Sequence, residues 1–382
     1  MQYRKFDKLG IECSTFGIGT MRLPLQKGHE GADNSKHIDE KESIRMIRHG
    51  IDNGVSYIDT AYGYHGGNSE VLVGKALKDG YREKVKIATK LPPWHVKVYE
   101  DFDRLLNEQL ERLQVEYIDF YLLHALGNDS WVKLRDLGIL EWLDKTVASG
   151  RIRYPGFSFH DELPVFKEII DAYDWKMCQI QFNILDEYEQ AGIEGLKYAG
   201  SKGIPVVIME PLRGGKLANV SPDIQELWEQ AEEKRSPVEW AFRWVYNFPE
   251  VAVILSGVST MEQLNDNLRI FQDSKPNCMS QDELDLVSKV KALYDAKTKI
   301  ACTACEYCLP CAFGVSIPRI FGIWNDAAMF GINDEHYQQY KKLIEEEKDA
   351  KQCTECGNCE SLCPQHLDII DKLKEADKAL RV

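Results

Sequence analysis

Short apolar segments that alternate with helical patterns constrain the fold of this chain more than any other feature of its sequence. After a short N-terminal hairpin, they lie near residues 15–19, 55–59, 85–90, 118–123, 152–158, 177–182, 205–210 and 251–256. Each is followed by a long loop or by apolar residues at helical spacing, as at Ile44, Ile47 and Ile51. Near-continuous apolar strands that alternate with helices are typical of a parallel sheet whose outer face is covered.

The number of strand–helix units separates two kinds of parallel sheet. Eight units within about 300 residues predict a closed (β/α)8 TIM barrel of the α/β class. A doubly wound sheet is the alternative, but the first glycine-rich turn, at Gly17 and Gly19, lacks the GxGxxG pattern of that fold. In addition, no ribose-binding acid follows that turn at the expected distance. We therefore expect a barrel rather than an open sheet.

Charge and hydropathy argue against nucleic acid and membranes as partners. The chain has 382 residues and a formal net charge of −14, so we expect no non-specific attraction to nucleic acid or to an anionic membrane. The N-terminus has no apolar signal-peptide region, and apolar runs such as Ile204 to Met209 are far too short to span a bilayer. The sequence therefore predicts a soluble cytoplasmic protein.

The cysteines are distributed very unevenly. Of the eleven in the chain, eight lie between Cys302 and Cys363, and the other three are scattered: Cys13, Cys178 and Cys278. This asymmetry predicts a domain boundary near residue 300. Because a cytosolic compartment keeps thiols reduced, the cluster indicates metal chemistry rather than a disulfide scaffold. We expect the three scattered cysteines to be inert.

Polar residues suited to proton transfer lie at the ends of consecutive predicted strands. Asp59 ends the second strand, Lys90 the third and His124 the fourth. Tyr64 lies in the loop after the second strand. The carboxyl ends of barrel strands form the functional face, so these four side chains should converge there. Taken alone, Asp59 and Tyr64 would favour a helix cap and a loop tyrosine, but Lys90 and His124 favour a catalytic site.

These four residue types have complementary roles in proton transfer. Tyr64 would protonate a carbonyl oxygen as hydride reaches the carbon, or deprotonate an alcohol in the reverse direction. The ammonium of Lys90 should lower the pKa of Tyr64 from its usual value of about 10. Asp59 should position Lys90 and keep it charged. His124 could donate a hydrogen bond to the substrate oxygen and orient it.

Three segments of the chain resemble the aldo-keto reductase superfamily. They are Ile58-Asp-Thr-Ala-Tyr-Gly-Tyr64, Ile87-Ala-Thr-Lys90 and Tyr117-Ile-Asp-Phe-Tyr-Leu-Leu-His124, and together they look like the Asp–Tyr–Lys–His tetrad of that family. The resemblance covers roughly residues 1–295. It implies reduction of a carbonyl or oxidation of an alcohol, with a nicotinamide cofactor held across the barrel mouth.

The later strand ends resemble the cofactor site of this family, with departures. Gln179 matches the glutamine that holds the nicotinamide amide, and Ser158 matches the serine of Gly-x-Ser-Asn. The asparagine is missing here, and His160 is a candidate substitute. Met209 stands where many members stack a tyrosine. The resemblance assigns cofactor binding to Gly19, Thr20, Met21, Asp59, Ser158, Gln179, Met209, Leu212, Gly214, Gly215, Lys216, Ser259, Gln263 and Asn267.

Two further segments resemble the phosphate-binding and adenosine-binding parts of that site. Residues 211–217 resemble the pyrophosphate loop, where glycine amides approach phosphate and Arg213 or Lys216 could add charge. An ordinary turn is the alternative for its two glycines. Residues 255–267 resemble the adenine-ribose site. There, Thr260 and Gln263 replace the basic residues that a 2′-phosphate normally demands. NADP is the family default, NAD is a real alternative, and a strong NADPH preference would require another basic residue such as Arg269.

The C-terminal cysteines follow the spacing of iron–sulfur proteins. The second block reads C-x2-C-x2-C-x3-C-P, which is the spacing of bacterial ferredoxins that bind 4Fe–4S clusters. The first block departs from this pattern because two residues precede its fourth cysteine and Ala312 replaces the proline. In such pairs the fourth cysteine usually serves the other cluster. We expect two clusters, one on Cys302, Cys305, Cys308 and Cys363, the other on Cys353, Cys356, Cys359 and Cys311.

Zinc is the alternative metal, because zinc ribbons also use C-x2-C pairs. Three consecutive C-x2-C steps followed by Cys-Pro favour iron–sulfur clusters instead. Between the two blocks, the stretch from Ile317 to Ala350 has helical spacing. The sequence therefore predicts a barrel over residues 1–297 and a mainly α-helical ferredoxin-like domain over residues 298–382.

Two hypotheses follow for the function. The first is an oxidoreductase acting on a small carbonyl or alcohol, whose clusters are structural, pass single electrons to a redox partner protein, or sense redox state. Coupling hydride transfer to the clusters would need a mediator such as a flavin, for which we find no motif. The second is a regulatory protein that senses nicotinamide, although the intact tetrad argues against it. Trp94, His95 and Trp131 are candidates for the substrate pocket, with packing as the alternative.

Overall fold

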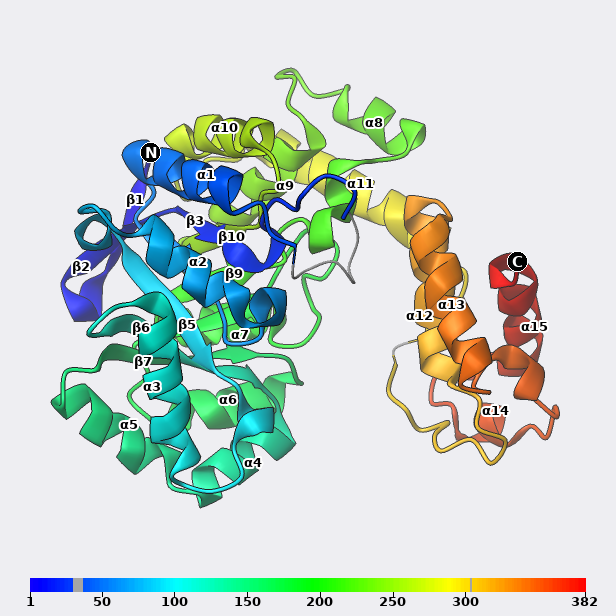
Figure 1. Ribbon diagram of the computed structural model, residues 1–382. Coiled ribbons are helices and arrows are strands. Elements are labelled where there is room, and N and C mark those ends of the chain that lie inside the picture. Colours follow the sequence, from blue (N-terminus) through cyan, green and yellow to red (C-terminus); the bar gives the residue numbers. More distant parts are fainter. Residues whose placement is uncertain (30–36, 303) are drawn as a thin grey trace. The chain divides into compact units, whose positions relative to one another are not determined.

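Eight parallel strands close into a barrel, which confirms the predicted fold. The computed structural model describes residues 1–29, 37–302 and 304–382. The strands neighbour one another in the order β10-β3-β4-β5-β6-β7-β8-β9, and β9 pairs with β10 to close the ring (Figure 1). Their bounds are β3 (Phe16–Gly19), β4 (Tyr57–Asp59), β5 (Lys86–Leu91), β6 (Ile118–Leu126), β7 (Ile152–Phe159), β8 (Met177–Gln181), β9 (Val206–Met209) and β10 (Val251–Ser256).

Helices that follow the strands in the sequence cover the outside of the barrel (Figure 1). They are α1 (Glu40–Asp52), α2 (Asn68–Ala76), α3 (Asp101–Leu113), α4 (Asn128–Asp136), α5 (Ile139–Ala148), α6 (Leu163–Ala172), α7 (Gly192–Ser201), α9 (Pro237–Tyr246) and α10 (Met261–Ile270). The start of α10 is set by Thr260, whose hydroxyl oxygen accepts from the backbone N–H of Gln263 at 3.2 Å. Such a cap stabilises a helix by about 1 kcal/mol and here fixes the turn after β10.

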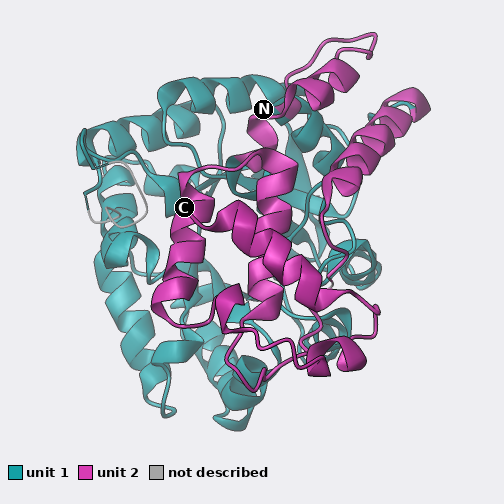
Figure 2. Ribbon diagram, turned by 90° about the vertical axis from the view of Figure 1, so that its right-hand side faces the viewer, with its two compact units in different colours: residues 1–215, 238–280 teal, residues 216–237, 281–382 magenta. Residues whose placement is uncertain are grey.

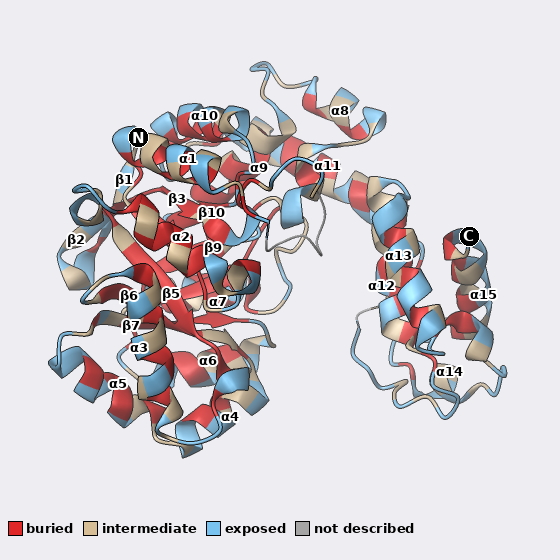
Figure 3. Cartoon of the chain, in the orientation of Figure 1, coloured by how far each residue is buried: buried red, intermediate tan, exposed pale blue. Residues whose placement is uncertain are grey.

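An N-terminal hairpin shares its core with the barrel interior. Strands β1 (Tyr3–Phe6) and β2 (Ile11–Ser14) pair antiparallel. Phe6 of this hairpin and Tyr57 of β4 each place their ring 5.5 Å from the ring of Phe120. All three residues are buried, and the barrel strands are coloured as buried along most of their length (Figure 3). Because side chains fill this part of the barrel, it is a packed core rather than a pore.

The chain forms two compact units (Figure 2). The first comprises Met1–Gly215 and Val238–Ser280, and the second comprises Lys216–Pro237 and Gln281–Val382. The second unit therefore includes a segment that lies between β9 and α9 in the sequence. The predicted boundary at residue 297 concerns sequence domains rather than compact units, and it stays a prediction.

The second unit is helical, as predicted for the C-terminal region. Its helices are α8 (Pro222–Trp228), α11 (Gln281–Lys297), α12 (Ile317–Phe330), α13 (Asp334–Glu345), α14 (Asn358–Leu362) and α15 (Ile369–Leu380). Phe321, Leu343 and Leu373 lie in one buried cluster that joins α12, α13 and α15. The predicted helical stretch from residue 317 to 350 is interrupted at Gly331, whose φ of 86° ends α12. Among the described residues, no helix combines the length and apolar character needed to cross a membrane.

Candidate active site and cysteine clusters

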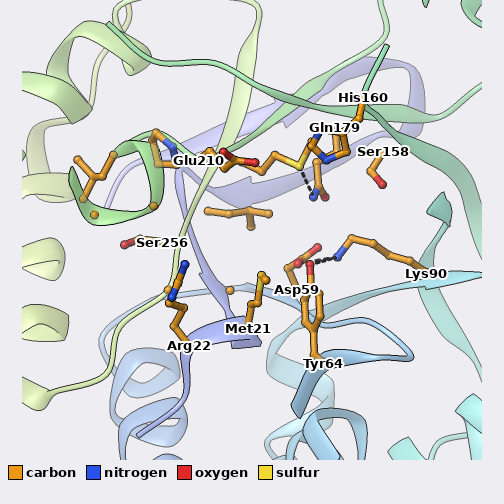
Figure 4. Close-up of a pocket in the computed structure, with 18 of the residues that line it drawn as sticks. Met21, Arg22, Asp59, Tyr64, Lys90, Ser158, His160, Gln179, Glu210 and Ser256 are labelled. Carbon is orange, nitrogen blue, oxygen red and sulfur yellow. Dashed lines mark hydrogen bonds and ion pairs between the residues drawn. The ribbon is translucent and has the colours of Figure 1, made fainter. Parts of the chain in front are cut away.

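A cavity of about 480 Å³ lies at the carboxyl ends of the barrel strands (Figure 4). All four predicted catalytic residues line it: Asp59, Tyr64, Lys90 and His124. Asp59 is the last residue of β4, Lys90 belongs to β5 and His124 to β6. Parallel strands place their carboxyl ends on one face, so residues far apart in the sequence meet here.

Lys90 makes three polar contacts at the buried end of this site. Its ammonium donates to Oδ1 of Asp59 at 2.7 Å and to the carbonyl oxygen of Thr60 at 2.8 Å. Its Nζ also lies 3.5 Å from the hydroxyl oxygen of Tyr64. Lys90 and Asp59 are only 1% and 2% exposed. Because a buried ammonium needs a carboxylate partner, this contact supports the role predicted for Asp59.

Burial and mutual attraction act in opposite directions on the pKa of Lys90. Burial lowers this pKa, but the interactions with Asp59, and then with Tyr64, outweigh burial and raise it overall. Burial raises the pKa of Asp59, and Lys90 opposes that rise. A lysine pKa above its ordinary value means that Lys90 is an ammonium ion at neutral pH.

The pKa of Tyr64 departs from the sequence-based expectation. Burial raises it above the usual value, Lys90 opposes the rise, and Asp59 and Glu210 add to it. The predicted lowering is therefore correct for the contribution of Lys90 but wrong for the net shift, because protein surrounds the hydroxyl group. At neutral pH Tyr64 is a protonated phenol, which is the form that a proton donor requires.

His124 is a neutral imidazole at neutral pH. Burial, followed by the nearby Lys90 and His160, lowers its pKa to about 3. Its ring is edge-on to that of Tyr64, with centroids 6.1 Å apart. Its Nδ1 is buried and has no hydrogen-bond partner among the residues that the structure describes. A neutral imidazole can donate one hydrogen bond to a substrate oxygen, which is the role predicted for His124.

Hydrogen bonds behind β4 hold the loop that carries Tyr64. The hydroxyl of Thr20 donates to the carbonyl oxygen of Asp59 at 2.9 Å, and Oγ of Ser69 lies 2.7 Å from the same hydroxyl. Directly after Tyr64, His65 has a φ of 52°, so the chain turns sharply before α2. Thr20 is fully buried in this network. It therefore supports the loop rather than lining the cavity.

The predicted cofactor residues fall into two groups. Nine of them line the cavity: Gly19, Met21, Asp59, Ser158, Gln179, Met209, Leu212, Gly214 and Gly215. Besides Thr20, four are not brought to it: Lys216, Ser259, Gln263 and Asn267. These four make other contacts, which indicate supporting roles.

Three of these four residues make their contacts around the strand ends. The Ser259 N–H donates to Oε1 of Gln263 at 2.9 Å, and the Ser259 hydroxyl donates to the carbonyl oxygen of Arg22 at 2.9 Å. Asn267 donates to the hydroxyl oxygen of Ser256, a cavity residue, at 3.0 Å. The ammonium of Lys216 instead donates to Asp326 at 2.5 Å.

The nicotinamide end of the predicted cofactor fits polar groups around the cavity. Oε1 of Gln179 is buried and, within the described ranges of the chain, has no hydrogen-bond partner. The Gln179 amide nitrogen lies only 3.5 Å from the sulfur of Met209 (Figure 4). Oγ of Ser158 accepts from the N–H of Ala125 at 2.8 Å, so its own proton can be donated to a bound group. An amide and a hydroxyl supply the donors and acceptors that a carboxamide needs.

The turn after β9 fits the phosphate end of the predicted cofactor. Gly214 and Gly215 both line the cavity and have φ values of 68° and 100°. Only glycine adopts such values without strain, and the absence of a Cβ lets backbone N–H groups approach an anion closely.

Two charged residues of the cavity were missed by the sequence analysis, Arg22 and Glu210. Nη2 of Arg22 lies 3.9 Å from the position that a Cβ on Gly214 would take. The Arg22 guanidinium has no partner among residues of the described part of the chain. Glu210 directly follows Met209, the last residue of β9. Both residues stand at or just beyond strand ends, so examining every charged residue at those positions would have found them.

The three candidates for the substrate pocket lie outside the set of described residues that line this cavity. Trp131 is buried, and its indole N–H donates to Glu168 at 3.0 Å, so it packs in the core. Trp94 is 55% exposed, and its ring lies 5.0 Å from that of His124. Trp94 is therefore placed at the rim, next to a residue of the cavity wall.

The C-terminal cysteines line two further cavities in the second unit. The smaller, of about 20 Å³, is lined by Cys302, Cys305, Cys308 and Cys363. The larger, of about 260 Å³, is lined by Cys308, Cys311, Cys353, Cys356 and Cys359. Apart from Cys308, which contributes to both, this division matches the crossed assignment of ligands from the sequence.

The arrangement of these thiols bears on which metal group they could hold. Within residues 1–29, 37–302 and 304–382, no three His, Cys, Asp or Glu side chains converge as the ligands of one metal ion would. Ligands of a single zinc ion lie roughly 4 Å apart, since each Zn–S bond is about 2.3 Å. The four cysteines of a 4Fe–4S cluster bind four different irons and are spread around its volume. Four cysteines line one cavity and five line the other, with Cys308 shared, so the thiols are spread around each space rather than gathered at one point.

Comparison with known proteins matches the barrel and the cysteine-rich region to two different sequence families. Residues 15–285 match the sequence model described as the aldo/keto reductase family. The chain belongs to the aldo/keto reductase family. Residues 301–367 match the model described as a 4Fe-4S dicluster domain. Among curated relatives, a probable aldo-keto reductase 1 of Glycine max is 28% identical over 297 residues, which covers 69% of this chain and 82% of that protein.

Solved structures of this family share the barrel. The holo form of aldo-keto reductase AKR11C1 from Bacillus halodurans is 25% identical, with a TM-score of 0.63, and the match covers 76% of this chain and 96% of that one. An aldo/keto reductase from Klebsiella pneumoniae, in complex with NADP and acetate, is also 25% identical. Its TM-score is 0.58, and the match covers 74% of this chain and 93% of that one.

Proposed function

We propose that the barrel is a nicotinamide-dependent oxidoreductase that interconverts a small carbonyl compound and its alcohol. The observation that supports this most is the buried Lys90, which donates to Asp59 at 2.7 Å and lies 3.5 Å from the hydroxyl of Tyr64. This contact places a phenol next to a fixed positive charge at the wall of an open cavity. Membership of the aldo/keto reductase family supports the same reaction class.

The catalytic residues act on the carbonyl oxygen. A bound reduced nicotinamide supplies the hydride for the carbon. Tyr64 donates its proton to the oxygen as negative charge develops there. The phenolate that Tyr64 becomes is stabilised by the ammonium of Lys90, which is already in place before the reaction. Asp59 keeps Lys90 charged and fixes its position, and neutral His124 orients the carbonyl through a hydrogen bond.

Residues of the cavity wall bind the cofactor in this proposal. Gln179 and Ser158 would bind the carboxamide, and the backbone of Gly214 and Gly215 would approach the phosphates. Arg22, at the same edge of the cavity, adds a positive charge for these phosphates. The bound NADP in the structure of the Klebsiella pneumoniae relative supports a cofactor of this class.

The second unit binds two 4Fe–4S clusters in our proposal. One is held by Cys302, Cys305, Cys308 and Cys363, and the other by Cys353, Cys356, Cys359 and Cys311. Such clusters supply one-electron chemistry or structural support when bound. Because hydride transfer moves two electrons together, we propose that the clusters serve a separate redox partner protein or the fold of the unit. A cytoplasmic location suits this arrangement, because that compartment keeps the thiols reduced.

The experiment for this proposal combines metal analysis with turnover. Protein purified without oxygen should contain about eight irons and eight sulfides per chain, since each of two clusters holds four of each. It should also oxidise NADH or NADPH in the presence of at least some members of a panel of small aldehydes and ketones. Nucleotide binding without turnover of any carbonyl would instead support a nicotinamide sensor.

A further inference from the structure

The segment Lys216–Pro237 follows the cofactor loop of the barrel in sequence but belongs to the second compact unit (Figure 2). It begins directly after Gly215, which lines the cavity of the first unit. A single peptide bond, between Gly215 and Lys216, therefore joins the proposed phosphate-binding turn to the iron–sulfur unit. What holds Lys216 thus bears on where Gly214 and Gly215 can lie.

Lys216 is held by Asp326 of α12. Its ammonium donates to Oδ2 of Asp326 at 2.5 Å, and the two side chains are 32% and 16% exposed. The same carboxylate oxygen lies 2.9 Å from Nε2 of His336 in α13. His336 is buried, and its Nδ1 accepts from the N–H of Asn333 at 3.1 Å. Since Nδ1 is the acceptor, Nε2 carries the proton and donates to Asp326. The carboxylate is therefore already fixed from the side of the second unit.

Further contacts anchor the rest of the segment within the same unit. The ammonium of Lys297 in α11 donates to the hydroxyl oxygen of Ser221 at 2.7 Å and to Asp223 at 2.9 Å. At the other end, Arg235 donates to Glu283 of α11 at 2.5 Å. Lys216 is thus the first anchored residue of a segment that α11 and α12 hold at three places.

The turn before Lys216 is the part that such an anchor would control. Gly214 and Gly215 have positive φ values, and glycine has more accessible backbone conformations than any other residue. A pair of glycines therefore takes a defined shape only when the residues on both sides are held. β9 and Pro211 lie on one side, and Lys216 provides the anchor on the other.

We propose that Asp326, a residue of the iron–sulfur unit, positions the cofactor loop of the barrel by holding Lys216. This inference rests on the proposed function, since it concerns the nicotinamide cofactor at that site. Asp326 does not touch the cofactor. It fixes Lys216 so that the backbone of Gly214 and Gly215 keeps the shape that binds the phosphates. Coupling of this kind is reciprocal, so a bound cofactor also stabilises the contact between Lys216 and Asp326.

The test measures the dissociation constants of NADH and NADPH for the full, cluster-loaded chain by fluorescence titration. Lys216→Met and Asp326→Asn should each weaken binding by roughly 3- to 10-fold, as expected for loss of a partly buried ion pair. The double variant should be no weaker than the weaker-binding single variant, because both remove one contact. Lys216→Arg keeps the charge and should retain most of the affinity. The Michaelis constant for the cofactor should rise while kcat stays unchanged.

Lys372→Met is the matched control. Lys372 lies in the same unit, is 33% exposed and pairs with Glu375. This variant should bind both nucleotides as the wild type does. Iron content and circular dichroism of every variant show whether the second unit is intact, and the Lys216 variants remain informative if Asp326→Asn does not fold.

Three results would overturn the inference alone, and a fourth would overturn the proposed function with it. If Asp326→Asn binds nucleotide as tightly as the wild type while Lys216→Met binds weakly, Lys216 contacts the cofactor itself. Tighter binding by Asp326→Asn would mean that Asp326 draws Lys216 away from the phosphates. If the wild type binds nucleotide and both Lys216→Met and Asp326→Asn bind it with the wild-type affinity, the inference is wrong but the proposed function stands. A wild-type chain that binds neither nucleotide defeats the proposed function as well.

Discussion

Lys90 donates to Asp59 at 2.7 Å in a place where both residues are almost completely excluded from solvent. Two opposite charges with so little access to water depend on each other for stability. The desolvation cost of each is compensated only while the partner is present. The pair that positions the proton donor is therefore also a structural element of the barrel, and its two functions can be separated by mutation.

Replacing Lys90 alone should destabilise the barrel strongly. Lys90→Met leaves the carboxyl group of Asp59 buried without its cation, which should lower the free energy of unfolding by about 3–5 kcal/mol. The double variant Lys90→Met with Asp59→Leu removes both charges and should recover most of that loss, while staying inactive. Urea denaturation followed by tryptophan fluorescence measures both effects. A single variant as stable as the wild type would show that the pair contributes nothing to folding.

The neutral His124 should make stability fall on the acid side of neutral pH. Its pKa is lowered to about 3 in the folded protein, whereas an unfolded histidine titrates near about 6.5. Between these values the unfolded chain binds the extra proton, so stability is full above the unfolded pKa and decreases as pH falls through this range. The slope should reach up to about 1.4 kcal/mol per pH unit.

Urea denaturation of the wild type and of His124→Gln at pH 7 and pH 5 measures this contribution. The variant should show the smaller loss of stability on acidification. Equal losses in the two proteins would mean that His124 does not titrate as its burial requires.

The crossed ligand assignment predicts an unequal outcome for two double cysteine variants. Cys305 and Cys363 line the same small cavity, so Cys305→Ala with Cys363→Ala should remove one cluster and leave about four irons per chain. Cys305→Ala with Cys311→Ala should affect both clusters. Iron analysis of protein purified without oxygen measures this difference. If the first pair lost both clusters and the second pair only one, each block would supply its own four ligands.

Discrimination between NADH and NADPH should be weak. Thr260 and Gln263 carry no charge, and the nearby Arg269 is held by Asp266 and Glu239, each at 2.9 Å. A 2′-phosphate would therefore find no free guanidinium on α10 among the described residues. Fluorescence titration should give dissociation constants for the two nucleotides that differ by less than about tenfold, which corresponds to 1.4 kcal/mol. A larger preference for NADPH would mean that Arg269 exchanges its carboxylate partners for the phosphate.

The parts of the fold that follow from local pattern could be predicted from the sequence. Each barrel strand is a short apolar run because both of its faces are buried, and this composition is visible without a structure. The convergence of Asp59, Lys90 and His124 follows from parallel topology once the strand ends are known. The break between α12 and α13 could also have been predicted, because Gly331 and Asn333 are typical of a helix end and a helix start. In the structure, the Asn333 side chain caps α13 by accepting from the N–H groups of Glu335 and His336.

Properties that depend on packing between distant parts of the chain could not be predicted. The ion pair between Lys216 and Asp326 joins residues 110 positions apart, and no local pattern marks either as the partner of the other. The direction of the Tyr64 pKa shift depends on how completely protein encloses the hydroxyl group. The positions of Tyr64 and Lys90 in the sequence do not indicate the extent of this burial. Arg22 and Glu210 match no motif, and only their positions at or just beyond strand ends would have marked them as candidates; that they line the cavity is a finding of the structure.

The central claim, that Tyr64 is the proton donor of a carbonyl reductase, is tested most directly by comparing two tyrosine variants. Tyr64→Phe removes the hydroxyl that lies 3.5 Å from Lys90, whereas Tyr62→Phe removes one that donates to Glu108 at 2.7 Å and lies outside the cavity. Oxidation of NADH and NADPH is measured with the carbonyl that the wild type reduces best. We expect Tyr64→Phe to lose about 10²- to 10⁴-fold in kcat with unchanged nucleotide affinity, and Tyr62→Phe to keep its activity. A Tyr64→Phe variant that turns over at the wild-type rate would contradict the account.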